Sequence, residues 1–298
     1  MPCVPFWGEL SRWNDAVRSF GGVRKDYRRR VSIDDPATAY GLFTGRFSEP
    51  LAREFANVVG PTPGQRVLDV GCGPGALTQV VVERVGAPGV AAVDPSEAFV
   101  AAAKARLPAV DVRRASAEDL PYADVTFDVA LAQLVVHFMA DPVAGLREMA
   151  RVTKPAGVVA ACVWDNAGGC GPLSPLWRAA HDLDPAIGDE GGAAGAREGH
   201  LAELARDAGL SRVQSSRLTV EVPFGTFQDW WEQLTLGVGS GGAYVHGLEE
   251  SHRQALRERL ERMLGPGPLT ASASAWCVRA EVAGSGSRSV ESNRRTGA

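Results

Sequence analysis

The stretch Val67-Leu68-Asp69-Val70-Gly71-Cys72-Gly73-Pro74-Gly75-Ala76-Leu77-Thr78 decides the fold of this chain. Its first four residues belong to a short apolar run over 66–70, and this run indicates a buried parallel strand. Three glycines at alternate positions follow, and apolar residues then recur at helical spacing as far as Val85. The stretch therefore predicts a strand, a tight glycine turn and a helix whose free N–H groups point at a ligand.

Two kinds of ligand are compatible with the glycines alone. Gly71, Gly73 and Ala76 also satisfy G-x-G-x-x-G/A, the dinucleotide-binding pattern. Asp69 favours a different ligand, because its carboxylate would face the site and repel a pyrophosphate. A nucleoside that carries a sulfonium and an ammonium, and no phosphate, suits a carboxylate at this position.

At this point the chain resembles the class I S-adenosylmethionine-dependent methyltransferases that act on small molecules. Their first motif is an acidic residue followed by G-x-G-x-G, here Asp69, Gly71, Gly73 and Gly75. The resemblance covers about residues 36–280 and is strongest over 66–165. It implies an α/β fold: a Rossmann-like, doubly wound seven-stranded sheet in the order 3-2-1-4-5-7-6, with a helical N-terminal lead and helical cap insertions. It also implies S-adenosyl-L-methionine as the cofactor.

Composition narrows the functional class further. The chain has 298 residues and a net charge of -4, so it lacks the global basic field typical of nucleic-acid binding. No apolar run approaches the roughly 18 residues that span a bilayer. Five scattered cysteines without a C-x-x-C pair indicate reduced thiols in a cytoplasmic protein, and no metal-ligand pattern is visible. We expect a monomer or homodimer that acts on a small-molecule substrate.

The chain divides into three parts. Residues 1–35 form a peripheral leader with a basic run, and one hypothesis places the native start at Val31. Residues 36–283 form the methyltransferase domain, with a cofactor-binding core over 60–165 and substrate-side insertions over 166–197 and 223–265. Residues 284–298 are rich in Gly, Ser, Arg and Asn and are expected to be disordered.

Cofactor-binding residues are expected at the ends of the predicted strands. Asp94 ends the second strand, roughly twenty residues past the glycines, where an acid accepts hydrogen bonds from ribose hydroxyls. By resemblance, residues 115–122 contact adenine, although the usual Asp is replaced by Ser116, and Arg46 reaches the methionine carboxylate. Gln133, after the fourth strand, is expected near the transferable methyl group. The predicted set is Arg46, Asp69, Gly71, Cys72, Gly73, Gly75, Asp94, Pro95, Ser116, Ala117, Glu118 and Gln133.

The sequence does not assign a catalytic base. Methyl transfer requires one only when the nucleophile is a hydroxyl or a carbon acid. His137 and Asp165 are candidates near the expected pocket, as are His181, Tyr244 and His246. Two alternative functions stay open: an NAD(P)-dependent oxidoreductase that uses the same glycine turn, and a non-catalytic binding module that retains the fold.

Overall fold

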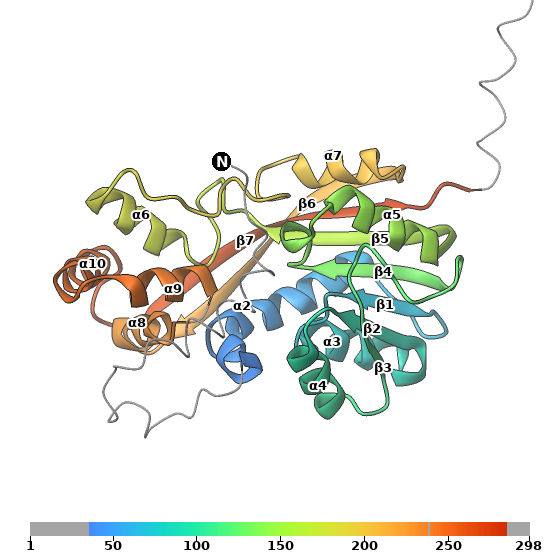
Figure 1. Cartoon of the computed structure of the whole chain (residues 1–298), viewed down its shortest axis with the longest axis horizontal. Coiled ribbons are helices and arrows are strands. Elements are labelled where there is room, and N and C mark those ends of the chain that lie inside the picture. The colour runs from blue at the N-terminus through green and yellow to red at the C-terminus, as the bar shows by residue number, and fades with distance from the viewer. Residues whose placement is uncertain (1–35, 238, 285–298) are drawn as a thin grey trace, which may run out of the picture.

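The computed structural model describes residues 36–237 and 239–284. Seven strands form one sheet in the order β3-β2-β1-β4-β5-β7-β6 (Figure 1). The strands are β1 (Val67–Val70), β2 (Val90–Asp94), β3 (Asp111–Arg114), β4 (Phe127–Gln133), β5 (Thr153–Trp164), β6 (Ser211–Phe224) and β7 (Leu269–Glu281). This order confirms the predicted topology, with the last strand antiparallel between β5 and β6.

Helices precede, connect and cap the strands. They are α2 (Pro36–Val59), α3 (Ala76–Val85), α4 (Glu97–Arg106), α5 (Pro142–Val152), α6 (Ser174–Leu183), α7 (His200–Asp207), α8 (Phe227–Thr235), α9 (Gly239–Gly247) and α10 (Glu250–Leu264), with 3-10 turns η2 (Ala87–Gly89) and η3 (Val136–Phe138). Local capping agrees with the sequence. The Ser96 hydroxyl accepts a hydrogen bond from Phe99 N at the start of α4, and Asp141 Oδ1 accepts from Ala144 N at the start of α5.

The topology places a binding crevice between β1 and β4. β1 pairs in parallel with β2 on one side, Val67 opposite Val90, and with β4 on the other, Val67 opposite Val129. The chain leaves β1 toward β2 and β3 and later returns to β4, so the connections after β1 and β4 diverge to opposite sides. In open α/β sheets, ligands bind beyond the carboxyl ends of the strands at this point of divergence.

Both faces of the sheet are buried. Val67 and Leu68 belong to separate apolar clusters, one on each side, as alternation along a strand requires. One cluster includes residues of α2, α3 and α4, and the other includes residues of α5 and α7. A central parallel sheet covered on both sides explains why its strands are nearly continuous apolar runs.

The remaining helices form a cap at one end of the sheet. α6, α8, α9 and α10 gather beyond the end of β5, at the left of Figure 1. Asp182 of α6 forms an ion pair with Arg259 of α10, with 2.6 Å between Oδ2 and Nη2. Trp230 of α8 is fully buried and Trp231 is 5% exposed, so this aromatic pair belongs to the core.

Two elements differ from the sequence pattern. Lys154-Pro155-Ala156-Gly157 has the composition of a turn, yet it lies within β5, which begins at Thr153. Helix α9 has the sequence GSGGAYVHG, and its glycine content argues against a helix. Packing favours it instead, because a Cβ at Gly241 would lie 2.8 Å from Leu173 and Leu176 side-chain carbons. Close approach to α6 thus selects glycine at this position.

The expected leader (residues 1–35) and almost all of the expected tail (284–298) lie outside the described residues. Across 36–237 and 239–284, the structure contains no helix that combines the length and the apolar character needed to span a membrane.

Candidate functional site

The glycine turn after β1 is fixed by packing on one side and open on the other. Gly71 and Gly73 have φ angles of 71° and 53°, in the left-handed region that favours glycine. A Cβ at Gly71 would lie 2.3 Å from Val135 Cγ2, whereas a Cβ at Gly73 would meet nothing within 4 Å. Gly71 is therefore required by the protein interior, and Gly73 faces space that a ligand can occupy.

The turn is also tied to β2 and to the start of α3. The backbone N–H groups of Gly71 and Cys72 both donate to Val93 O, at 2.8 and 2.9 Å. Gly75, with φ 91°, is the residue from which α3 begins. The Cys72 side chain is buried, and its burial raises the pKa of the thiol. This cysteine therefore stays a neutral thiol and lines the site without acting as a nucleophile.

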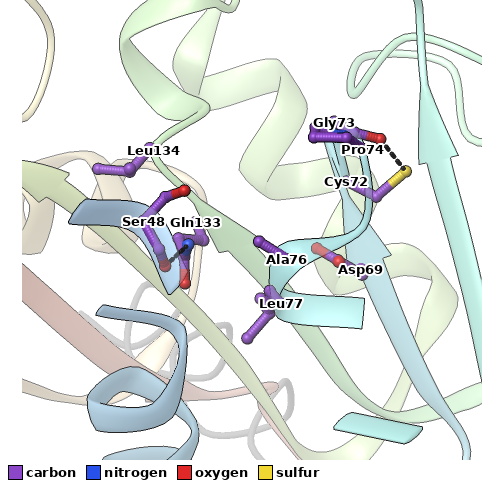
Figure 2. Close-up of a pocket in the computed structure, with 10 residues that line it drawn as sticks. Ser48, Asp69, Cys72, Gly73, Pro74, Ala76, Leu77, Gln133 and Leu134 are labelled. Atoms are coloured by element: carbon purple, nitrogen blue, oxygen red, sulfur yellow. Dashed lines mark hydrogen bonds between the residues drawn. The ribbon is translucent and has the colours of Figure 1, made fainter. Parts of the chain in front are cut away.

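Residues from α2, β1, the glycine turn, α3 and β4 line one hollow at the crevice. Figure 2 shows Ser48 and Gln133 on one side of it and the glycine turn on the other. Its cavity volume is about 30 Å³, roughly the space of one water molecule, so a nucleoside would extend from it along the strand ends. The lining residues are Ser48, Asp69, Gly71, Cys72, Gly73, Pro74, Ala76, Leu77, Gln133 and Leu134.

Gln133 joins β4 to α2 across this hollow. Its Nε2 donates to Ser48 O at 2.9 Å, and its buried Oε1 has no hydrogen-bond partner among the residues that the structure describes. A buried acceptor without a donor is costly, which indicates a position that a ligand group completes. The next residue, Leu134, has a φ of 59°, a strained conformation for a residue with a side chain. Sequence reasoning did not assign Ser48 or Leu134 to the site. Ser48 contributes a backbone carbonyl and Leu134 a left-handed φ angle, and neither feature produces a recognisable residue pattern.

Asp69 is the most strongly perturbed acid in the hollow. Its carboxyl group is 1% exposed, and its Oδ2 accepts a hydrogen bond of 2.6 Å from the Thr78 hydroxyl. Burial raises the pKa of Asp69 from 3.8 to about 7, Thr78 opposes that rise, and the negative charge of Asp94 adds to it. Thr78 had no predicted role, although its position in the first turn of α3 places it below the acid. A positive ligand charge would stabilise the ionised form of Asp69.

Asp94 holds the glycine turn from the end of β2. Its Oδ2 accepts from Gly73 N at 2.9 Å and its Oδ1 from Ser96 N at 2.8 Å. Burial raises the pKa of this carboxyl group, and the two backbone donors act in the opposite direction. Each carboxylate oxygen has more than one acceptor position, so Asp94 keeps capacity for further donors such as ribose hydroxyls.

Other predicted cofactor residues lie away from the hollow or use their side chains elsewhere. Arg46 Nη2 donates to Pro223 O at 2.7 Å, and its guanidinium lies 4.2 Å from the centre of the Phe224 ring. Glu118 Oε1 accepts from Ala140 N at 2.8 Å, so its side chain binds the turn before α5. Pro95 O accepts from Arg114 Nε at 3.0 Å.

The segment predicted to contact adenine is held from α5. Ser116 is half-buried, Ala117 is buried, and the loop beyond them is fixed by Leu120 N, which donates to Glu148 Oε2 at 3.1 Å. Arg151 Nη2 donates to Leu120 O at 3.1 Å and to Glu148 Oε2 at 2.7 Å. The segment is thus a positioned loop beside the ends of β2 and β3.

His137 and Asp165, the two principal candidates for a catalytic base, both have surroundings that weaken or occupy their proton-accepting atoms. Burial lowers the pKa of His137 to about 4, so its imidazole is neutral at pH 7, and its buried Nδ1 has no hydrogen-bond partner within residues 36–237 and 239–284. Asp165 Oδ1 accepts from Gly168 N at 2.9 Å, and its Oδ2 lies 3.2 Å from Arg217 Nη2. His137 is a weak proton acceptor at such a pKa, and Asp165 is engaged in a loop and an ion pair.

The other three candidates lie in the cap. His181 belongs to α6, and Tyr244 and His246 belong to α9. His181 Nε2 lies 2.8 Å from Ile187 O. Within residues 36–237 and 239–284, no group of three or more His, Cys, Asp or Glu side chains is arranged to hold a metal ion.

Comparisons with known proteins agree with this geometry. Residues 68–161 match a family model described as a methyltransferase domain. A ubiquinone biosynthesis O-methyltransferase of Rhizobium etli is 41% identical over 103 residues, which are 33% of this chain and 41% of that protein. A demethylmenaquinone methyltransferase of Renibacterium salmoninarum is 34% identical over 129 residues, 42% of this chain and 54% of that protein. The chain thus spans about half or less of these relatives.

The fold is shared with solved structures at low identity. A structure of phosphoethanolamine N-methyltransferase 2 of Haemonchus contortus, in complex with S-adenosyl-L-methionine, has a TM-score of 0.50 and 18% identity. The match covers 88% of this chain and 61% of that one.

Proposed function

We propose that this chain, which carries a class I S-adenosylmethionine-dependent methyltransferase domain, transfers a methyl group to an O, N or C atom of a small-molecule acceptor. The observation that carries the proposal is the pair of buried carboxylates, Asp69 and Asp94, on either side of an open glycine turn at the ends of β1 and β2. Family membership rests on the match over 68–161 and on the strand order.

The residues at the site fit S-adenosylmethionine. Asp94 has acceptor capacity for the ribose hydroxyls, and Gly73 leaves room for the ligand to approach the backbone. Asp69 and the unpartnered Gln133 Oε1 would face the cationic methionine end. Residues 116–118 would contact adenine through backbone groups and the Ser116 hydroxyl. The contact predicted for Arg46 requires its guanidinium to leave Pro223 O.

The Asp69 carboxylate opposes a dinucleotide, whereas Asp94 would accept ribose hydroxyls of either ligand. Asp69 is 1% exposed, and a pyrophosphate beside the turn would add negative charge to a poorly solvated site. The repulsion between Asp69 and Asp94 is already sufficient to help raise the pKa of Asp69. We therefore infer that the oxidoreductase alternative is disfavoured by charge, although the glycine pattern permits it.

When bound, S-adenosylmethionine supplies a methyl group that the sulfonium already activates for in-line displacement. The chain then has to orient the acceptor and exclude water, and orientation alone contributes on the order of 7–11 kcal/mol in favourable cases. Gln133 and Leu134 line the hollow, and we infer that the acceptor approaches beside them. His137 and Asp165 stay candidates for proton transfer, and neither is assigned.

The proposal also covers the class of methyl acceptor, the oligomeric state and the cellular compartment. We infer a small molecule bound under the cap helices, without a nucleic-acid partner, by a monomer or homodimer. Cys72, Cys162, Cys170 and Cys277 are free, which accords with the reducing conditions of the cytoplasm.

The proposal is tested with methyl-labelled S-adenosylmethionine and a small-molecule extract of the producing cells. We expect label to appear in an extract component with the wild type and to fall sharply with Asp94→Ala. Cofactor binding without transfer to any component would favour the non-catalytic binding module. Oxidation of NADH or NADPH by the extract and the protein would favour the oxidoreductase.

A further inference from the structure

Glu190 is an acid of the cap that the proposed cofactor site does not use. It lies in the connection between α6 and α7, and its Oε1 accepts a hydrogen bond of 2.5 Å from the hydroxyl of Ser240 in α9. Its Oε2 accepts from Asn166 Nδ2 at 3.4 Å. The carboxyl group thus joins three segments of the cap: the residues after β5, the connection itself and α9.

The charge of Glu190 is not neutralised by the protein. Among the residues that the structure describes, no Lys, Arg or His side chain forms an ion pair with it. Its side-chain partners, Ser240 and Asn166, are neutral, and the nearby Asp189 adds negative charge. Burial raises the pKa of Glu190. A poorly solvated carboxylate without a cation is costly, so this position favours a positive charge brought by a ligand.

Aromatic rings stand beside this carboxylate. Trp177 of α6 lies against Tyr244 of α9, with 5.4 Å between the ring centres. The buried Trp177 Nε1 has no aligned hydrogen-bond partner, although it lies near enough to Glu190 to favour its charged form. Trp177 and Tyr244 are half-buried, so part of each side chain stays accessible to a solute. Aromatic faces next to a carboxylate are the surroundings that bind organic ammonium groups.

These residues are connected to the cofactor site by packing. Ser48 lines the hollow, and its neighbour Phe47 contacts Trp164 edge to face, with 6.5 Å between ring centres. Trp164 is the last residue of β5, and Asn166 follows two residues later. β5 pairs with β4, where Cys162 lies opposite Gln133. The acid therefore lies in the cap, beside the segment that follows β5.

We propose that Asn166, Trp177, Glu190, Ser240 and Tyr244, here called the cap cluster, bind an organic ammonium group of the methyl acceptor. This inference rests on the proposed function, because it names a substrate class for the same enzyme. The ammonium would anchor one end of the acceptor, while another part of the molecule approaches Gln133.

A matched pair of probes isolates the charge. Phenethylamine carries an ammonium group where 2-phenylethanol carries a hydroxyl group. Calorimetry of the full chain with each compound gives two affinities, and their ratio, amine over alcohol, measures the preference for the charge. We expect about a tenfold or larger preference for the amine, as a hydrogen-bonded charge pair provides. In Glu190→Gln this ratio should fall to within about twofold of one. Glu198→Gln, which removes an exposed acid of the same connection, should leave it unchanged. A wild-type ratio near one, no amine binding, or a preference that persists in Glu190→Gln overturns the inference.

A stability measurement separates ligand binding from a structural role. Because the charge is partly buried and has no cationic partner in the described part of the chain, Glu190→Gln should unfold at the same temperature as the wild type or higher at pH 8. A clearly lower unfolding temperature together with an unchanged amine preference would show that Glu190 only fastens α9, and would overturn the proposal. The same preparations are titrated with S-adenosylmethionine. Cofactor binding without amine preference rejects this inference alone, whereas absent cofactor binding rejects the proposed function.

Discussion

Substitution of Asp69 by Asn tests the electrostatics of the site most informatively. The carboxyl group is 1% exposed and accepts a hydrogen bond from the Thr78 hydroxyl. Asn keeps an acceptor oxygen for that hydroxyl and removes the charge. The variant therefore isolates the effect of ionising this one group inside the protein.

The magnitude follows from the pKa of Asp69. Burial raises this pKa from 3.8 to about 7, so the native state holds a proton that the unfolded state releases at lower pH. Stability is therefore lost as the pH rises between these two values. Each pH unit corresponds to about 1.4 kcal/mol, and two units lie between pH 5 and the native pKa. The free energy of unfolding of Asp69→Asn minus that of the wild type should grow by about 3 kcal/mol between pH 5 and pH 8.

Urea unfolding of both proteins at pH 5, 6, 7 and 8 measures this difference, because other titrating groups largely cancel in the comparison. The affinity of the wild type for S-adenosylmethionine should rise with pH, whereas its free energy of unfolding should fall relative to that of Asp69→Asn. The affinity should rise by up to tenfold per pH unit below about 7, as Asp69 ionises, and stay nearly flat for Asp69→Asn. A stability difference that is constant across these pH values would refute the reasoning, since Asp69 would then titrate like an exposed acid.

Four further substitutions test the site and the core. Asp94→Ala should weaken S-adenosylmethionine binding about tenfold or more in calorimetry, as loss of hydrogen bonds to a charged group predicts; unchanged binding would remove Asp94 from the site. Gly71→Ala should destabilise the fold by about 2–4 kcal/mol in urea unfolding, because its Cβ would lie 2.3 Å from Val135 Cγ2. Gly73→Ala should lower the free energy of unfolding by only about 1–2 kcal/mol, yet it should weaken cofactor binding. Equal effects of Gly71→Ala and Gly73→Ala on stability and on binding would contradict the assignment of Gly73 to the side of the turn that is open to a ligand. Trp230→Ala should cost about 3–5 kcal/mol, since this side chain is fully buried, and a loss below about 1 kcal/mol would show that it is not core.

The centre of the sheet was predictable because β1, β2 and β4 are short runs of mostly apolar, buried residues. Arg66 to Val70 predicted β1 (Val67–Val70), and the Asp141 cap predicted the start of α5. Helix α9 was not predictable, because its glycine content argues against a helix and Gly241 is selected by close contact with Leu173 and Leu176. Propensity describes isolated segments, and here the tertiary contact outweighs it.

The site was predictable where a residue type carries the chemistry. Asp69, Gly73 and Gln133 line the hollow, and their part in cofactor binding stays a prediction. The direction of a long side chain was not predictable. Arg46 donates to Pro223 O, and that choice depends on how α2 lies against β6. The left-handed backbone of Leu134 also leaves no trace in the sequence.

The central claim is that an acid ahead of an open glycine turn selects a sulfonium nucleoside over a phosphate-bearing one. Calorimetry of the full chain with S-adenosylmethionine, S-adenosylhomocysteine and NADH tests it directly. The account predicts binding heat with the first two and none with NADH. Binding of NADH alone would contradict it.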